Sequence, residues 1–396
     1  MEKIIMHIDV NSAFLSWTAV DLLKNGYKKD IRCECSVIGG DESKRKGIVL
    51  AKSTLAKNKG INTAETLYQA RSKCRNLKIY RPNYALYDKM SHAFFTLLRK
   101  YTNDIEILSI DECFLDYGKV KKMYGDEVIF ANKLKNEIYK TLGFTVNIGI
   151  ANNKLCAKMA SDFSKPNKIH TLYDYEIKEK MWPLPVENLY GIGKKSTEKL
   201  INLNIKTIKD LATCNKEILY PYFKNQTDYI IKIANGIDDS DVLSEKKDPK
   251  CISTTTTLLY DYDDIAEINK ELKTISEKIS NELKEKSVYT SRVAVIIKDK
   301  YFKTTSHQNK LPNPTNSLNE IYEMSKKIFK EYWDETPVRL IGIRVDAFSS
   351  SKDYQISLFE DVKKKENDEI VDALIDSLIK KYGDKIIKKW YNQKEW

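Results

Sequence analysis

Apolar residues in the first half of the chain fall into short runs that end at acidic or turn-forming residues. Residues 1–10 predict a strand that stops just after Asp9, and residues 12–25 predict a helix capped by Asn11 or Ser12. Residues 105–117 predict two short strands or one bent strand, and residues 145–150 predict a further strand. These elements favour a mixed sheet covered by helices.

A helical period dominates the next segment. Apolar residues within 152–163 share one face, and Asn152 stands at the N-cap position, which predicts an amphipathic helix. Residues 176–235 predict a small helical domain, with Gly191 and Gly193 in a turn between helices. Residues 237–250 are almost all polar or charged and have no period, so they are interpreted as a linker.

Strands and helices alternate regularly after the linker. The predicted elements are strand 251–260, helix 263–286, strands 291–298 and 301–307, helix 317–333 and strand 338–347. This order, βαββαβ, is the ferredoxin-like arrangement, which serves many functions. A tail begins after residue 348 and contains a predicted helix at 368–382. The fold class is therefore α+β with several domains.

Composition narrows the class of protein. A chain of 396 residues has material for two to four domains, and its net charge of +11 favours a polyanionic partner. We expect a cytoplasmic protein, because the chain shows neither a signal peptide nor an apolar stretch of membrane-spanning length. We also expect it to be a monomer. The seven cysteines are scattered, which indicates reduced thiols that pack as small apolar side chains.

Three acidic residues suggest the chemistry. Asp9, Asp111 and Glu112 lie at the ends of apolar runs, where a carboxylate is costly to bury without a partner or a cation. Carboxylates that bridge two Mg²⁺ ions are the usual apparatus of nucleotidyl transfer. Because neighbouring residues of a strand face opposite ways, Asp111 and Glu112 can share a site only if the chain turns or bulges near residues 109–112. Taken alone, acids in this pattern are more often solvated strand ends than metal ligands.

Four segments, in the same order along the chain, resemble motifs of the Y-family (translesion) DNA polymerases. The segments are residues 7–16 (HIDVNSAFLS), 109–112 (SIDE), 149–162 followed by Lys165-Pro166-Asn167, and 191–195 (GIGKK). The resemblance covers roughly residues 1–350 and is nearest to the bacterial polymerase IV branch.

This resemblance implies a right-hand polymerase. The expected parts are a palm (1–20 and 77–167), fingers (21–76), a helix-hairpin-helix thumb (168–236), a linker (237–250), a ferredoxin-like little finger (251–348) and a tail (349–396). The implied catalytic residues are Asp9, Asp111 and Glu112, which together with the main-chain carbonyl of Val10 would bind two Mg²⁺ ions.

The resemblance also implies contacts with the incoming nucleotide. Phe14 matches the steric-gate aromatic, whose ring excludes a ribose 2′-hydroxyl; judged on its own, Phe14 would be a core residue. Lys165 matches a palm lysine that contacts the triphosphate. Thr54 and Lys57 stand where the family usually has a Tyr and an Arg that bind the β- and γ-phosphates, and Lys52 is another candidate.

Contacts with DNA follow from two further regions. Gly191 and Gly193 can bring backbone N–H groups close to a phosphate before a helix. Residues 253–257 and nearby basic residues of the little finger could follow the template backbone.

In the tail, Gln355, Leu358 and Phe359 resemble the peptide by which bacterial polymerases bind the sliding clamp.

The resemblance therefore implies a template-directed DNA polymerase of low fidelity that extends primers past damaged bases. Its partners would be primer–template DNA, dNTP and the sliding clamp. Three alternatives stay open at this point: a polymerase V-like catalytic subunit that needs accessory proteins, a palm-type nucleotidyl cyclase, and a non-catalytic DNA-binding scaffold recruited to the clamp.

Overall fold

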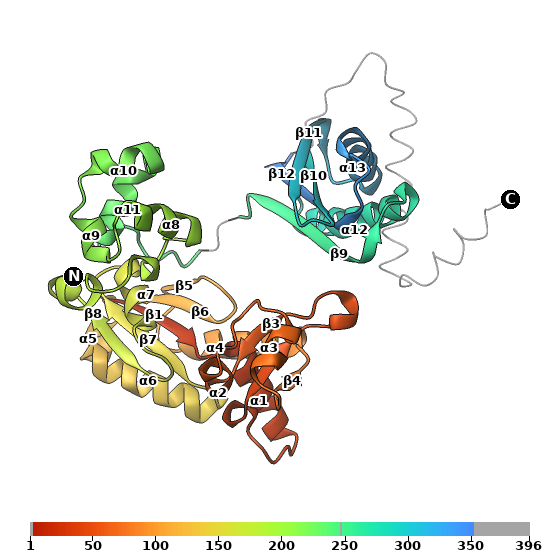
Figure 1. Cartoon of the computed structure of the whole chain (residues 1–396). Coiled ribbons are helices and arrows are strands. Elements are labelled where there is room, and N and C mark those ends of the chain that lie inside the picture. The colour runs from red at the N-terminus through yellow and green to blue at the C-terminus, as the bar shows by residue number, and fades with distance from the viewer. Residues whose placement is uncertain (1–2, 246–247, 352–396) are drawn as a thin grey trace. The chain divides into compact units, whose positions relative to one another are not determined.

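A computed structural model describes residues 3–245 and 248–351 of the chain. The chain divides into two compact units, Met1–Glu42 with Lys46–Lys247, and Ser43–Arg45 with Asp248–Trp396 (Figure 1). Each unit has its own hydrophobic core. Among the described residues, no helix has both the length and the apolar character needed to cross a membrane.

A five-stranded sheet organises the first unit, in the order β5-β6-β1-β7-β8. The strands are β1 (Ile5–Val10), β5 (Ile105–Ile107), β6 (Glu112–Asp116), β7 (Val146–Ala151) and β8 (Ile169–Leu172). β1 lies between β6 and β7 and is antiparallel to both, whereas β8 runs parallel to β7. The sheet is thus mixed, as predicted. β8 was not predicted, because its four residues are too few to establish a period.

Helices cover both faces of this sheet (Figure 1). They are α1 (Ala13–Lys24), α4 (Tyr84–Leu98), α5 (Lys121–Tyr124), α6 (Glu127–Leu142) and α7 (Lys154–Asp162). Ile4, Met6 and Ile8 pack into the core formed with α1, α4 and α6, whereas Ile5 packs into the core formed with α7. Because side chains alternate along β1, Asp9 lies on the same face as Ile5, toward α7.

A smaller three-stranded sheet, of order β3-β2-β4, forms the fingers region. Its elements are β2 (Ser36–Gly39), β3 (Val49–Lys52), α2 (Thr54–Asn58), α3 (Leu67–Lys73) and β4 (Lys78–Tyr80). Val49 and Leu67 are among the few buried residues of its core. This region therefore has far less buried apolar material than the five-stranded sheet.

Short helices follow β8, as the sequence predicted. They are α8 (Lys194–Asn202), α9 (Ile208–Ala212), α10 (Lys216–Phe223) and α11 (Thr227–Ala234). Gly191 has a φ of 93°, which only glycine adopts readily, so the turn before α8 requires this residue.

The second unit has the predicted βαββαβ order. Its elements are β9 (Cys251–Tyr262), α12 (Ile265–Glu285), β10 (Tyr289–Asp299), β11 (Thr304–Thr315), α13 (Leu318–Tyr332) and β12 (Val338–Ser349). The sheet order is β11-β10-β12-β9, with every neighbouring pair antiparallel. Each strand–helix–strand crossover thus leaves one strand between the two that it joins, as in a split βαβ fold.

One prediction needs correction, and others concern residues that the structure does not describe. The N-cap of α7 is Asn153, whose side chain accepts a hydrogen bond from the Cys156 N–H, so the prediction of Asn152 is wrong by one residue. Gln355, Leu358, Phe359 and the predicted helix 368–382 lie outside the described residues. The domain boundaries given above stay predictions.

Candidate active site

The end of β1 and the turn before β6 bring the three acids to one edge of the sheet. Asp9 lies directly opposite Glu112 in the β1–β6 ladder, so their side chains share a face. Asp111 precedes β6, and its carbonyl accepts a 3.0 Å hydrogen bond from the Val10 N–H. The Ser109 hydroxyl donates to Asp111 Oδ1 at 2.6 Å. β5 and β6 are thus two separate strands joined by a turn at the place where the chemistry required one.

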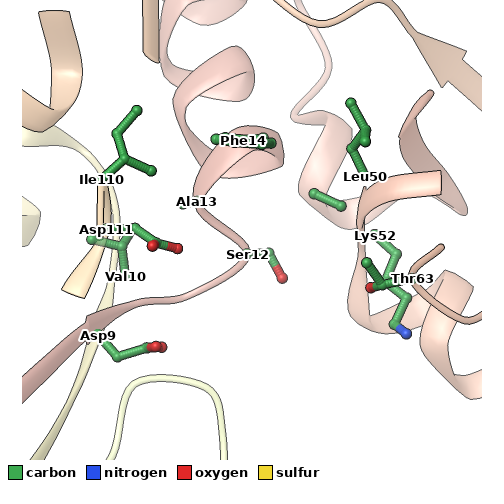
Figure 2. A pocket seen from close by; sticks show the side chains of 11 residues that line it. Asp9, Val10, Ser12, Ala13, Phe14, Leu50, Lys52, Thr63, Ile110 and Asp111 are labelled. Atoms are coloured by element: carbon green, nitrogen blue, oxygen red, sulfur yellow. The ribbon is translucent and has the colours of Figure 1, made fainter. Parts of the chain in front are cut away.

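A cavity of about 310 Å³ opens beside this edge (Figure 2). Its lining residues are Asp9, Val10, Ser12, Ala13, Phe14, Leu50, Ala51, Lys52, Thr63, Ile110 and Asp111. We call Asp9, Val10, Ile110 and Asp111 the palm wall, and Leu50, Ala51, Lys52 and Thr63 the fingers wall. The two walls face each other, with Phe14 on α1 between them (Figure 2). Glu112 lies beside the cavity without lining it.

Asp111 carries an unfavourable negative charge. Burial raises the pKa of its carboxyl, and the nearby charges of Asp9 and Glu112 raise it further, although the Ser109 hydrogen bond opposes the shift. A cation placed between these carboxylates would relieve both costs. The site therefore has the electrostatics of a place where positive charge is bound.

Glu112 is held by partners on the α7 side of the sheet. Its Oε2 lies 2.6 Å from Lys158 Nζ and 3.3 Å from Nε2 of His7, a fully buried side chain. The His7 hydrogen bond and the Lys158 charge lower the pKa of Glu112 to about 2. His7 Nδ1 in turn lies 2.8 Å from the Ser161 hydroxyl, and burial lowers the pKa of its imidazole. This carboxylate is thus ionised and fixed in place.

Lys165 lies on the other side of the sheet edge that carries the three acids. Its Nζ lies 2.8 Å from Asp9 Oδ1 and 2.9 Å from Asp162 Oδ1. Burial alone would lower the pKa of Lys165, but the charges and hydrogen bonds of the two aspartates outweigh it and raise the pKa. Lys165, which the resemblance gives as a triphosphate-binding lysine, is therefore protonated and lies at the acidic edge.

The donor types suit a hard divalent cation, since carboxylate and carbonyl oxygens are the ligands that Mg²⁺ prefers. In the part of the chain that the structure describes, no group of three or more His, Cys, Asp or Glu side chains is arranged so that it could hold a metal ion. Asp9 and Glu112 are instead paired with Lys165 and Lys158. The structure brings the acids to one place, and their role as metal ligands stays a prediction.

Phe14 is fixed by its aromatic neighbours. Its ring stacks on that of Tyr87, with centroids 4.4 Å apart and planes 6° apart. Tyr87 is fully buried, and its hydroxyl lies 3.1 Å from that of Thr18. Phe14 therefore lines the cavity and cannot easily move aside, which is what a steric gate requires.

The phosphate contacts predicted for the fingers stay a prediction. Thr54 and Lys57 are exposed on α2 and do not line the cavity, whereas Lys52, the alternative candidate, does. Thr63, which also lines it, was missed by sequence reasoning. No local pattern points to Thr63, because its position depends on the pairing of the loop around Ala64 with β3.

The thumb turn has the form expected of a backbone-binding motif. Gly193 caps α8, and open space surrounds the position that a side chain would occupy there. Gly191 adopts the positive φ noted above, and Ile192 between them is buried. The turn is thus anchored by Ile192 while Gly193 stays accessible.

Comparisons with known proteins agree with this geometry. Models of the impB/mucB/samB family match residues 8–162, its C-terminal domain matches residues 249–358, and the IMS family HHH motif matches residues 175–205. The chain is 46% identical over 390 residues to DNA polymerase IV of Clostridium acetobutylicum, covering 98% of each chain. It is 33% identical over 394 residues to DNA polymerase IV 1 of Bacillus subtilis, covering 98% of this chain and 92% of that one.

Solved structures give the same picture. A Y-family DNA polymerase chimera of Dbh and Dpo4 superimposes with a TM-score of 0.76 at 25% identity, covering 88% of this chain and all of that one. An insertion ternary complex of Dbh DNA polymerase, at 23% identity and a TM-score of 0.61, shares the fold over 87% of this chain and 98% of that one. The chain belongs to the impB/mucB/samB family of Y-family DNA polymerases, in its bacterial DNA polymerase IV branch.

Proposed function

We propose that this chain adds deoxynucleotides to the 3′ end of a DNA primer, as directed by a template, and that it does so past damaged bases. As a Y-family member it is a DNA-directed DNA polymerase of translesion synthesis. The observation that supports the proposal for this site is that Asp9 and Asp111 share one cavity with the rigid ring of Phe14. Low fidelity is part of the same proposal, as the family resemblance implies.

The palm wall would orient the reacting groups. We infer that Asp9, Asp111 and Glu112, with the carbonyl of Val10, hold two Mg²⁺ ions. Such ions, when bound, lower the pKa of the primer 3′-hydroxyl and offset charge on the pyrophosphate that leaves. Asp9 would exchange its partner Lys165 for a cation, which frees the Lys165 ammonium for the triphosphate. Glu112 would keep its orientation, because Lys158 binds its Oε2 and the buried His7 ring lies beside it.

Phe14 would select the sugar. A stacked ring that cannot retreat overlaps with an added 2′-oxygen but leaves room for a deoxyribose. Gly191 and Gly193 would hold the duplex through its phosphates, which positions DNA without reading its sequence. Binding to primer–template DNA should therefore weaken steeply as salt rises.

Recruitment to the sliding clamp through Gln355, Leu358 and Phe359 rests on the sequence alone. So do the monomeric state and the cytoplasmic location. A pull-down of the clamp by the full chain, compared with a variant in which Leu358 and Phe359 are both changed to Ala, tests the first of these. Loss of binding in the variant is the expected result.

Primer extension tests the function itself. Purified full-length chain, a labelled primer on an undamaged or abasic template, dNTPs and Mg²⁺ should yield lengthened primers on both templates. EDTA should abolish the product. A cyclic nucleotide formed from free NTP would indicate the cyclase alternative, and the absence of any product would indicate the scaffold.

A further inference from the structure

The fingers wall contains a basic residue and a hydroxyl, on the side of the cavity opposite the acidic palm wall (Figure 2). Lys52 is the single basic residue among the described residues that line the cavity. Thr63 is exposed beside it. These two residues differ from the pair, Thr54 and Lys57, that stands where the family has its fingers contacts.

The placement of both residues is structurally defined. Lys52 ends β3 opposite Val37 of β2, and it is followed by Ser53, which caps α2. The loop that carries Thr63 is fixed to β3 by two backbone hydrogen bonds, Ala64 N–H to Val49 O at 2.8 Å and Val49 N–H to Glu65 O at 2.9 Å. Strand and loop thus present the two side chains to the cavity together.

Lys52 differs from the other lysines around the site. Lys165, Lys158 and Lys154 each have a carboxylate partner within 3 Å. Within the described part of the chain, the side chain of Lys52 has neither a hydrogen bond nor an ion pair.

Its surroundings favour an anion. Burial lowers the pKa of Lys52, and the charges of Lys57 and Lys73 lower it further, while Glu65 opposes them. Glu65, however, is already paired with Lys73 at 2.5 Å. The ammonium of Lys52 is therefore available to an anionic ligand in the cavity.

We propose that Lys52 and Thr63 bind the β- and γ-phosphates of the incoming nucleoside triphosphate, in place of Thr54 and Lys57. This inference rests on the proposed polymerase function. A nucleotide whose α-phosphate lies at the palm wall and whose sugar lies against Phe14 must direct the rest of its triphosphate toward another part of the cavity. The ammonium supplies a point charge, and the hydroxyl supplies one hydrogen-bond donor.

Single-nucleotide insertion kinetics test this assignment. Loss of a contact that is equally strong in the ground state and the transition state raises KM without changing kcat. Lys52→Gln should therefore raise the KM for dNTP by about tenfold or more at a nearly constant kcat. Thr63→Val should raise it about threefold. The matched control is Lys59→Gln, an exposed lysine at the end of α2, which should change KM by less than about twofold.

Two further measurements identify the ligand group. Inorganic tripolyphosphate should inhibit the wild type competitively with dNTP, and its inhibition constant should weaken in Lys52→Gln by about the same factor as KM. The Kd for primer–template DNA should stay unchanged in that variant, and its thermal unfolding should match that of the wild type.

Several results would overturn the assignment. One is an unchanged KM in Lys52→Gln together with a raised KM in Lys57→Gln or Thr54→Ala. Another is a weakened DNA Kd at constant dNTP KM, which would make Lys52 a DNA contact. Failure of the polymerase proposal looks different, since the wild type itself would then extend no primer.

Discussion

The two walls of the cavity are supported in opposite ways. The palm wall stands at the end of β1, whose neighbour β7 is buried along its whole length, and cores lie on both faces of that sheet. The fingers wall stands on the four-residue edge strand β3 and a loop, over a small core. The comparison suggests that charged groups which must be held close together need the larger core, because only a rigid surround keeps buried carboxylates from separating.

The largest expected effect tests the palm wall. Asp111→Asn removes a proposed metal ligand, so we expect primer extension to fall by about a thousandfold or more. The same change should raise thermal stability, by ~2–4 °C for each kcal/mol of relieved repulsion and burial cost. Single-turnover extension and thermal unfolding measure the two effects.

Asp116→Asn is the matched control for that prediction, because Asp116 stands at the far end of β6, the strand that Asp111 precedes, and does not line the cavity. It should leave extension intact. Equal extension rates in Asp111→Asn and the wild type would remove Asp111 from the chemistry.

The second prediction concerns the ring between the walls. Phe14→Ala should reduce discrimination against ribonucleotides by about a hundredfold, because the space beside the sugar opens. Phe14→Tyr keeps the ring and should keep the discrimination. The ratio of kcat/KM for dNTP and rNTP is the measurement, and an unchanged ratio in Phe14→Ala would show that the gate lies elsewhere.

The third prediction is a pH dependence of stability that comes from Glu112, beside the palm wall. The folded-state pKa of Glu112, about 2, lies below that of an unfolded glutamate, about 4.3, so the unfolded chain binds the proton more tightly. Ionised Glu112 should therefore add about 2–3 kcal/mol of stability above pH 5, which is lost as the pH falls toward 2.

Urea unfolding of the wild type and Glu112→Gln, in metal-free buffer between pH 6 and pH 3, measures this contribution. The difference in unfolding free energy between the two proteins should shrink toward acid pH. Glu187→Gln, an exposed glutamate, serves as the control. A difference that is constant with pH would contradict the assigned pKa shift.

The smallest expected effect tests the fingers wall. Thr54→Ala should change the KM for dNTP by less than about twofold, because Thr54 is exposed on α2 and does not line the cavity. Steady-state insertion measures this, with Thr63→Val as the contrasting variant. A tenfold increase of the KM for dNTP in Thr54→Ala would show that Thr54 contacts the nucleotide, as the family resemblance implies.

The difference between the walls also explains what the sequence could predict. The apolar runs around Asp9 and Asp111 predicted buried strands, and the acids at their ends predicted a shared edge, because long buried strands leave few alternatives. The βαββαβ order was equally predictable, since the period of each element in the second unit is regular. The four segments that resemble Y-family motifs then indicated the family.

The fingers wall could not be predicted in this way. Lys52 and Thr63 are 11 positions apart, and they meet only because the loop pairs with β3 through backbone hydrogen bonds that carry no sequence signal. The pairing of Glu112 with His7 and Lys158 was likewise hidden, because it depends on which helix covers that face of the sheet. Hydrophobic periods within a segment can be recognised in the sequence, whereas interactions between segments can be recognised only once the fold is known.

The most direct test of the central claim is to count the divalent ions held by the palm wall. Mn²⁺ binding, followed by electron paramagnetic resonance, can be measured in a complex of the chain with a 3′-dideoxy primer–template and the matching dNTP. We expect two ions in the wild type and at least one fewer in Asp9→Asn and in Asp111→Asn. Equal number and affinity of bound ions in all three proteins would contradict the assignment of these carboxylates as the metal site.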